Sequence, residues 1–547
     1  MTVLIKEMFI HYSDQSSNDA LLEFDYEYTD SVKYFYSFLR PIDESLDMLF
    51  KRISSKISKI KYRKCNKKIK NHPMANNCDI KVVDSETFNE LQATELSIRS
   101  LLSFKICLKI NEALYNVCLN PPWIKQCYLP KICMVNCPVY PIFEAVNAEN
   151  TKFNFKWYKG KSKTTNEWIE CCSDSVFIPS QEHLNHFLKL EVSTAVNISR
   201  QVFKIISNNP VENFPQAHYQ LSMLFDKTNI NENEDSFTMC TYNILSHIYA
   251  ETPHSKKVLY RHCDKKYLSH DYRQSLILGE IIQRSSDLIF LQEVDQSFFF
   301  QMLHPILKYF NYDGIYQNKS KNKLEGQAIF WKINKFKLLE NISIPCLSDE
   351  INKIESFCEM KSMLTDTNLI EKWQSMGQCM TGCVLQAVFG STNKRLILSN
   401  NHLFFHPDYE IFRLFQVGIV FNQLERLKRE YYGSACIIGG DFNASFEDDS
   451  IKFIFDNQIQ LQYENKSIKL EHGMRNLLGV HRDVVEFSNF TPDYVGLLDH
   501  VIIDSEKIGI KRAYKTPSRE EIEENIALPN KFHPSDHLPL YCDLLFL

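Results

Sequence analysis

Polar residues that can bind a divalent cation or transfer a proton stand beside short apolar runs in the C-terminal half of the chain. They are Asn243, Glu293, Asn400, His402, Asp441, Asn443, Asp499, Asp536 and His537. Carboxylate and amide oxygens are ligands that Mg²⁺ prefers, and Mg²⁺ keeps several waters for exchange with substrate. Histidines can donate to phosphoryl oxygens, and a carboxylate can orient or deprotonate an attacking water. These residue types predict metal-assisted hydrolysis of a phosphodiester.

The apolar runs have the length of buried strands, and polar residues end most of them. They read TMCTYN, DLIFLQE, RLILSNNH, ACIIGGDFN and LLDHVIID. Segments with helical spacing of apolar residues, such as 271–284 and 411–428, lie between several of the runs. Buried strands alternating with helices predict a layered α/β domain, in which strand ends open into ligand-binding loops. We therefore expect the polar residues to converge on one pocket.

Each motif has an ordinary structural explanation when it is taken alone. Glu293 can be a surface charge after a strand, GGDFN (439–443) a turn, and SDHLP (535–539) a helix cap or a loop. Single short motifs often arise by chance, whereas six of them in one order beside apolar runs are hard to obtain from unrelated turns. The functional prediction therefore rests on the ordered set.

The ordered set resembles the endonuclease–exonuclease–phosphatase superfamily, in its deadenylase-like branch. The motifs that carry the likeness are YNIL (242–245), LQEV (291–294), NNHLFFHP (400–407), GGDFN, NFTPDYVGLLDHVI (489–502) and SDHLP. The likeness is strong from residue 237 onward and extends weakly to FKWYK (155–159) and NPP (120–122). It implies an α/β fold built on a two-layer β-sandwich flanked by helices, with one or two Mg²⁺ ions as cofactor.

The resemblance also implies a role for each residue. Glu293 matches the main metal ligand, with Asn243 in the same inner shell. Asp441 and Asn443 match the pair that binds the metal or positions the water, and Asp441 is the expected proton acceptor. The remaining implied roles are His402 and His537 as phosphate contacts, Asp536 as the group that orients His537, Asp499 as part of the same polar network, and Pro407, Tyr494, Asn400 and Asn489 as substrate-binding residues.

Two positions are expected to contact a base, and two others depart from the family pattern. Pro407 and Tyr494 are expected to sandwich a base, and ordinary loop packing is a nearly equal alternative for both. Asn401 stands where threonine is usual in the family, and His500 stands where tyrosine usually follows the aspartate. Neither departure removes a catalytic group. We interpret His500 as a structural residue.

A chain of 547 residues exceeds the usual limit of a single core, so at least two domains are expected. We predict a β-rich N-terminal accessory domain over 1–205, a polar linker over 206–236 and the catalytic domain over 237–547. Segment 51–70 holds ten Lys or Arg residues and no acid, with apolar residues at helical spacing. It is either a solvated helix face followed by a loop or a contact for the RNA backbone.

The composition restricts the partners and the compartment. A formal net charge of −5 argues against a protein that binds polyanions over its whole surface, so RNA or oligoadenylate must be held locally. Apolar runs stay shorter than about 18 residues, so no membrane partner is expected, and no obligate protein partner is evident. The resemblance implies the mitochondrial matrix, although the first residues lack basic amphipathic character; the cytoplasm is the alternative.

Three functions remain as hypotheses. The first, implied by the resemblance, is a Mg²⁺-dependent phosphodiesterase and 3' exoribonuclease that hydrolyses 2',5'-linked oligoadenylate and the 3' poly(A) tails of RNA to AMP. The second keeps the fold in a 3',5'-only deadenylase or a phosphatase of terminal or cyclic phosphates, because the catalytic groups contact only the phosphate. The third is a non-catalytic RNA-binding scaffold, which has no need for a full set of metal and proton-transfer groups.

Overall fold

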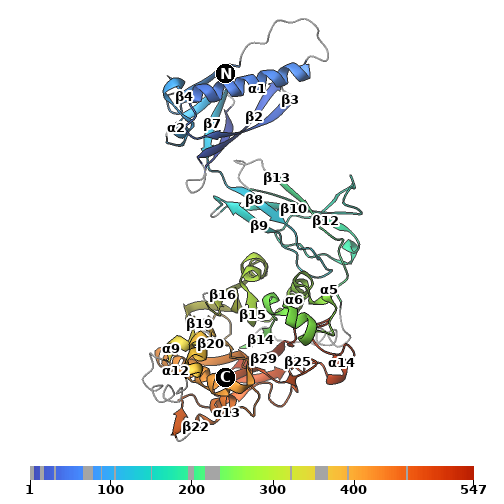
Figure 1. Ribbon diagram of the computed structural model, residues 1–547, viewed down its shortest axis with the longest axis vertical. Coiled ribbons are helices and arrows are strands. Elements are labelled where there is room, and N and C mark those ends of the chain that lie inside the picture. Colours follow the sequence, from blue (N-terminus) through green and yellow to red (C-terminus); the bar gives the residue numbers. More distant parts are fainter. Residues whose placement is uncertain are drawn as a thin grey trace.

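The computed structural model describes the chain except for residues 1–4, 13–17, 30–31, 66–77, 88, 104–105, 149–150, 195–201, 216–234, 321–322, 352–366, 391–393 and 464–465. The described parts form an elongated molecule (Figure 1). A sheet with a long helix lies at one end, a small β-rich unit lies in the middle, and a large α/β unit lies at the other end.

The N-terminal unit is a seven-stranded sheet in the order β3-β2-β1-β7-β6-β4-β5. Its strands are β1 (Ile5–His11), β2 (Asp19–Thr29), β3 (Val32–Pro41), β4 (Ile80–Asp84), β5 (Glu90–Leu91), β6 (Ile106–Ile110) and β7 (Ala113–Leu119). Helix α1 (Leu46–Cys65) packs its buried Phe50, Ile53 and Ile57 against this sheet, and α2 (Ile98–Ser103) follows later in the chain. The helical spacing expected from the sequence is therefore present in α1, whereas residues 66–70 of the basic segment lie outside the described residues.

The middle unit is built on a four-stranded sheet in the order β11-β10-β12-β13 and a separate pair, β8-β9. The strands are β8 (Trp123–Tyr128), β9 (Ile142–Val146), β10 (Phe153–Gly160), β11 (Ile169–Cys172), β12 (Phe187–Thr194) and β13 (Val202–Ile206). Trp157 is fully buried and stacks on Phe177, so it belongs to the core of this unit. The predicted linker falls largely on residues 216–234, outside the described residues.

The C-terminal unit contains two six-stranded sheets. The first has the order β16-β17-β15-β14-β29-β28 and the second the order β18-β19-β20-β21-β27-β24. The strands of the first are β14 (Ser236–Asn243), β15 (Leu288–Asp295), β16 (Tyr312–Asn318), β17 (Glu325–Lys332), β28 (Ile508–Ala513) and β29 (Leu540–Phe546). Those of the second are β18 (Phe336–Asn341), β19 (Met380–Ala387), β20 (Arg395–His402), β21 (Ala435–Asp441), β24 (Leu477–Gly479) and β27 (Asp499–Asp504).

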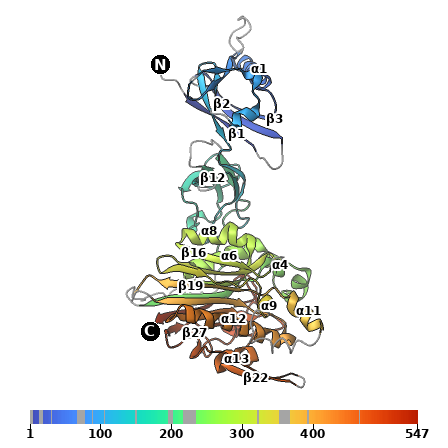
Figure 2. The same cartoon turned by 90° about the vertical axis from the view of Figure 1, so that its left-hand side faces the viewer.

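The two sheets pack face to face, and helices cover their outer faces (Figure 2). Apolar residues from both sheets, among them Phe290 and Ile437, form one buried cluster. Against the first sheet lie α6 (His270–Arg284), α7 (Gln296–Phe298) and α8 (His304–Tyr309); against the second lie α9 (Leu347–Glu350), α11 (Thr367–Ser375), α12 (Glu410–Glu430) and α13 (Asp449–Asp456). The predicted two-layer β-sandwich flanked by helices, with a β-rich N-terminal region, is confirmed.

Shorter elements border the edge of the sandwich where the polar residues lie. They are α4 (His247–Ala250), α5 (Lys265–Leu268), the 3-10 turn η6 (Pro407–Tyr409), α14 (Arg519–Glu523) and the hairpin β25 (Asn489–Phe490) with β26 (Val495–Gly496). A further hairpin, β22 (Gln458–Tyr463) with β23 (Lys466–Glu471), packs against α13. None of the described helices is long and apolar enough to cross a membrane.

Strand direction brings the predicted polar residues to one edge. Strand β14 runs parallel to β15 in the first sheet, and β20 runs parallel to β21 in the second. The carboxyl ends of parallel neighbours meet at the same edge of a sheet. Asn243, Glu293, His402 and Asp441 stand at or near the ends of these four strands, so both sheets contribute side chains to one place.

Candidate active site

Asn243 connects the two sheets where the predicted carboxylates meet. It ends β14, and its side-chain Nδ2 donates to Glu293 Oε1 at 3.1 Å and to Asp441 Oδ2 at 2.9 Å. Glu293 belongs to the first sheet and Asp441 to the second. Because one amide nitrogen contacts both carboxylates, they lie close enough to share one cation.

A β-bulge in β15 turns Glu293 toward this point. The register between β15 and β17 shifts between Leu291 and Val294, and Glu293 has a φ of 55°, in the left-handed region. Non-glycine residues are uncommon in that region, and bulges often re-aim a side chain next to an active site. The backbone N–H of Ser246 donates to Glu293 Oε2 at 3.0 Å, so the protein holds both carboxylate oxygens.

The acidic groups around Asn243 are crowded and poorly solvated. Burial, with the charges of Asp536 and Glu325, raises the pKa of Glu293 to about 7. Burial raises the pKa of Asp441 to about 6, although the charge of His537 opposes this. A divalent cation among these oxygens would favour the ionised carboxylates. The residues present therefore fit a hard divalent cation held by oxygen ligands.

Asn443 closes a tight loop beyond Asp441. Its backbone N–H donates to Asp441 Oδ1 at 2.8 Å, and its own φ is 48°. Its side-chain Nδ2 donates to the carbonyl of Leu403 at 3.0 Å, which anchors the loop to the end of β20. The loop thus fixes the direction of the Asp441 carboxylate. That Asn443 binds the metal or positions the water stays a prediction.

Two histidines flank the same oxygen of Asp441. His402 Nε2 lies 3.6 Å and His537 Nε2 3.7 Å from Asp441 Oδ2. Burial and the charge of Lys319 hold the pKa of His402 well below its usual range. Burial acts in the same direction on His537, but the charges of Asp499 and Asp441 outweigh it and raise the pKa of His537 well above its usual range. These shifts favour the charged form of His537 and the neutral form of His402.

The structure corrects the predicted partner of His537. Its Nδ1 lies 2.6 Å from Asp499 Oδ2, so Asp499, and not Asp536, orients the ring. Asp536 Oδ2 instead accepts from the hydroxyl of Tyr260 at 2.9 Å. The physical reason is the alternation of side chains in extended backbone, which sends neighbouring residues to opposite sides. Residue 537 is extended here, as its backbone bridge to Asn489 indicates.

The prediction that Asn400 binds substrate is wrong. Its side chain is fully buried, its Nδ2 donates to the carbonyls of Leu291 and Ala328, at 2.9 and 3.0 Å, and its Oδ1 accepts from Gln292. These bonds cross from the second sheet to the first, so Asn400 connects the two layers beneath the site. The sequence places it two residues before His402, but does not show which face of β20 meets the other sheet.

The other predicted substrate residues lie near the site edge. Asn489 is buried in β25, bridged to His537 through its backbone. Pro407 is exposed at the start of η6, and Tyr494 is 48% exposed in the turn before β26. The charge of Asp441 contributes to raising the pKa of Tyr494, after burial and the charge of Asp448, which places that ring on the active-site side. Their contacts with a base stay predictions.

His500 has the surroundings of a structural residue. Its ring is buried, its Nε2 lies 2.7 Å from the carbonyl oxygen of Ala444, and it packs edge-on against Phe446 at 4.8 Å between centroids. These contacts agree with its interpretation as structural.

A buried ion pair beside Glu293 was not predicted from the sequence. Lys319 Nζ lies 3.3 Å from Glu325 Oε1, both side chains are almost fully buried, and Tyr249 donates its hydroxyl to the same oxygen at 2.8 Å. The charge of Lys319 acts on both Glu293 and His402. The sequence position of the two residues could have indicated this pair, because Lys319 directly follows β16 and Glu325 begins the neighbouring strand β17.

The family is identified by comparison with known proteins. Residues 240–537, more than half of the chain, match the model of the Endonuclease/Exonuclease/phosphatase family. The chain belongs to this family. It is therefore a hydrolase of a group whose enzymes are typically dependent on divalent metals, which agrees with the acidic and histidine cluster at the sheet edge.

Several relatives are similar over much of the chain. Mouse 2',5'-phosphodiesterase 12 is 29% identical over 474 residues, which cover 80% of this chain and 76% of that protein. The human protein of the same name is 28% identical, over 80% of this chain and 75% of its own length. A probable CCR4-Not complex 3'-5'-exoribonuclease subunit Ccr4 of Vairimorpha ceranae (strain BRL01) is 27% identical over 56% of this chain and 63% of its own length.

A solved structure is similar to part of the chain. ANGEL2, described as a 2',3'-cyclic phosphatase and crystallised with adenosine-2',3'-vanadate, has 20% sequence identity and a TM-score of 0.48. The match covers 57% of this chain and 96% of ANGEL2.

Proposed function

We propose that the chain is a Mg²⁺-dependent phosphodiesterase that removes adenylate from the 3' end of RNA and hydrolyses 2',5'-linked oligoadenylate, with AMP as the product. The observation that carries the proposal is the contact of one Asn243 amide with the carboxylates of both Glu293 and Asp441. Similarity to 2',5'-phosphodiesterase 12 over 80% of the chain supports the substrate class.

Each residue has a definite task in this reaction. Glu293 and Asp441 would hold the Mg²⁺, and Asn243, whose Nδ2 now donates to both carboxylates, would turn its amide oxygen toward the ion. The bound ion would supply positive charge to a phosphoryl oxygen. His537 donates a hydrogen bond to the developing negative charge on the phosphoryl group, and Asp499 keeps its ring in place. Asp441 accepts the proton of the attacking water.

Substrate recognition is assigned to the loops around this edge. Pro407 and Tyr494 are exposed, and they are proposed to hold a base between them, because stacking on an aromatic ring contributes about 1 to 3 kcal/mol per base. Residues 1–205 are proposed as an accessory domain, and the mitochondrial matrix as the compartment. Imaging of a C-terminally tagged chain would test the compartment, and an even cytoplasmic signal would exclude the matrix.

The test is a digestion of 2',5'-linked and 3',5'-linked oligoadenylate side by side, with Mg²⁺ and with a chelator. We expect AMP from both substrates, loss of AMP with chelator, and no AMP from Glu293→Ala. A panel with terminal and cyclic phosphates runs in parallel. If both adenylates stay intact while a phosphate of the panel is released, the substrate assignment is wrong. If an RNA-linked cellular effect survives in Glu293→Ala, the protein acts as a scaffold.

A further inference from the structure

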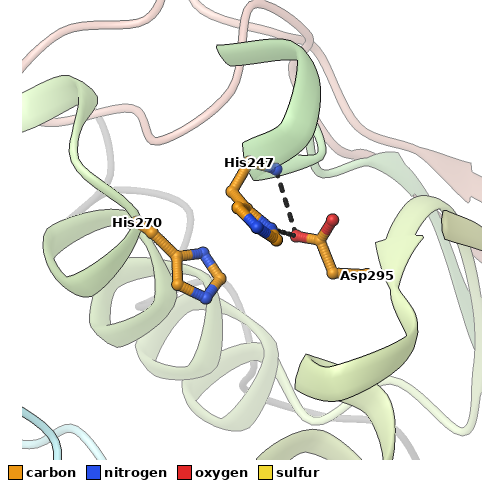
Figure 3. A group of neighbouring side chains, drawn as sticks. All are labelled: His247, His270 and Asp295. Carbon is orange, nitrogen blue, oxygen red and sulfur yellow. Dashed lines mark hydrogen bonds and ion pairs between the residues drawn. The ribbon is translucent and has the colours of Figure 1, made fainter. Parts of the chain in front are cut away.

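A second group of metal-binding side chains lies beside the candidate active site. His247 begins α4, His270 begins α6, and Asp295 ends β15. One ligand atom of each lies within 4.8 Å of the other two, and Figure 3 shows the His247 ring between the His270 ring and the Asp295 carboxylate. We propose that these three residues bind a transition-metal ion, Zn²⁺ or one of similar chemistry, in a site separate from that of Glu293 and Asp441.

The donor set distinguishes this site from the candidate active site. Imidazole nitrogen suits Zn²⁺ and its neighbours in the transition series, whereas Mg²⁺ requires oxygen ligands. Two histidines and one carboxylate occupy three positions of a tetrahedral ion and leave the fourth for water. The active-site ligands, in contrast, are carboxylate and amide oxygens. The two sites should therefore select different ions.

The geometry requires only a small adjustment to close around an ion. His247 Nδ1 lies 2.8 Å from Asp295 Oδ2, and the two imidazole centroids are 4.4 Å apart. The side chain of Gln274 contacts Nε2 of His270, which leaves Nδ1 of that ring for the ion. Ligand atoms of one tetrahedral Zn²⁺ lie about 3.4 Å apart. A rotation of the His270 ring toward His247 would bring the third ligand to this spacing.

The residues around the cluster hold its ligands in place. Asp295 Oδ1 accepts from the hydroxyl of Ser246, and Asp295 Oδ2 accepts from the backbone N–H of His247 at 3.1 Å. The backbone N–H of His270 donates to Glu251 at 3.0 Å. Such outer contacts orient metal ligands and contribute to metal affinity.

Acidic groups outnumber the cations that act on the cluster. Asp295, Glu251 and Asp271 are the acids, and the buried Arg273 is the opposing cation. The Arg273 guanidinium is occupied with the carbonyl of Leu245, to which its Nη1 donates at 2.6 Å. His247 is about one-third exposed, with 35% of its side chain accessible, so an ion can enter from that side.

One residue connects the proposed metal site to the candidate active site. Ser246 donates its hydroxyl to Asp295 and its backbone N–H to Glu293. An ion bound to His247, His270 and Asp295 would fix α4, α6 and β15 relative to one another, and with them Ser246. The proposed role is therefore to brace the segment that positions Glu293.

The experiment titrates Co²⁺, a coloured substitute for Zn²⁺, into the full chain carrying Glu293→Gln. This background weakens the oxygen site, so the result does not depend on hydrolysis. We expect one equivalent of Co²⁺ with the visible absorption of a nitrogen-ligated ion, and a rise in melting temperature with Zn²⁺. His270→Ala should abolish both effects. The matched control is His304→Ala, because His304 pairs with Asp313 at 3.7 Å near the surface and should leave both effects intact.

A second variant protects the test against misfolding. If His270→Ala unfolds the chain, as judged by circular dichroism, the partly exposed His247→Ala decides the outcome. Loss of the Co²⁺ absorption in a folded variant supports the site. Absence of the absorption in the parent chain, or its persistence in a folded His247→Ala or His270→Ala variant, overturns the proposal and leaves the cluster as an ion-paired brace. Neither result decides whether the chain hydrolyses adenylate, which is measured separately.

Discussion

Asp499 is buried and Asp536 is half-buried, and these two acids of the site contact different partners. Asp499 contacts the ring of His537, and Asp536 accepts from Tyr260 and raises the pKa of Glu293. The first carboxylate therefore acts on His537, the histidine proposed to contact the phosphate, and the second acts on Glu293, the acid proposed to bind the metal. Substitution of each by asparagine, which keeps the size and removes the charge, should separate these roles.

We predict that Asp499→Asn lowers kcat by about 10² to 10⁴, because His537 loses the group that orients it and maintains its charge. The Mg²⁺ concentration for half-maximal activity should change little. Asp536→Asn should mainly change that Mg²⁺ concentration, since it acts on Glu293. Steady-state kinetics over a Mg²⁺ series measures both. Equal loss of kcat in both variants, with the Mg²⁺ requirement unaltered, would restore Asp536 as the orienting residue.

Most residues of the candidate site could be predicted because they stand at or beside the ends of strand-like runs. The sequence could not assign Asp499 to His537, because that contact depends on how two distant segments approach one another. It also could not show that Asn400 faces the opposite sheet. The cluster of His247, His270 and Asp295 was missed for a similar reason, since its members come from three elements and form no local motif.

At the scale of elements, the approach of β20 to β21 sets the position of Asp441. Gly440 has a φ of 125°, and a Cβ added there would lie 2.0 Å from the backbone oxygen of Asn401. Only glycine tolerates both the backbone conformation and this distance. The strand pair can therefore present Asp441 and His402 side by side because residue 440 has no side chain.

We predict that Gly440→Ala destabilises the protein by at least about 2 kcal/mol, because the backbones of β20 and β21 must separate. Gly439→Ala is the matched control, since its φ lies outside the left-handed region and the nearest contact of the added Cβ would be a ring atom of Phe290 at 3.1 Å. Urea unfolding measures both. A Gly440→Ala variant as stable as Gly439→Ala would show that the strands tolerate a wider spacing.

His481 connects the segment after β24 to strand β29. Its Nε2 lies 2.9 Å from the carbonyl oxygen of Tyr541, and burial lowers its pKa to about 4. The unfolded chain binds a proton near pH 6.5, whereas the folded chain does not until about pH 4. Stability is therefore lost as the pH falls between these values, and this residue contributes a loss of about 3 kcal/mol by pH 4.

We predict that His481→Gln flattens the fall of melting temperature between pH 6.5 and pH 4, because glutamine can still donate to Tyr541 and has no proton to gain. The readout is the slope and not the stability at one pH. His304→Gln, at a partly exposed position, is the control. Identical slopes for His481→Gln and the parent chain would mean that His481 does not titrate as described.

At the scale of the whole molecule, the middle unit contacts the C-terminal unit through α6. Lys131 pairs with Asp271 at 3.0 Å, and Ser275 donates to the carbonyl of Ile132 at 2.9 Å. Met134 of the middle unit also packs in one buried cluster with Leu276 of α6. Helix α6 begins with His270. The middle unit therefore supports the helix that carries one ligand of the proposed second metal site.

The N-terminal architecture could be predicted only in part. A β-rich domain was expected over 1–205 without the positions of its first strands, and the structure contains three strands, β1 to β3, before α1. Strand β1 pairs in parallel with β7, which lies about a hundred residues later, and periodicity within a short window does not reveal such a partner. The layered fold of residues 237–547 was easier to predict from the sequence. Its strands are buried on both faces, so they appear in the sequence as continuous apolar runs.

Substitutions on the basic face of α1 can test whether the N-terminal unit contacts RNA. Lys51 pairs with Asp47 at 2.8 Å and Arg52 with Glu44 at 2.9 Å, so part of its charge is already balanced. We predict that Lys51→Gln with Arg52→Gln leaves the salt dependence of RNA binding unchanged. If these residues do neutralise phosphates of single-stranded RNA, the double variant should reduce the slope of log binding constant against log salt concentration. The reduction should be about 0.7 for each phosphate that loses its cation. Such a fall would favour the RNA-backbone interpretation.

Anomalous diffraction from crystals of the full chain soaked in Mn²⁺ tests the central claim most directly. Mn²⁺ accepts the oxygen ligands that suit Mg²⁺ and can be located by its scattering. The account predicts an anomalous peak between the carboxylates of Glu293 and Asp441, next to Asn243, and its loss in Glu293→Ala. No peak at that position in the parent chain, or a peak that Glu293→Ala leaves unchanged, would contradict it.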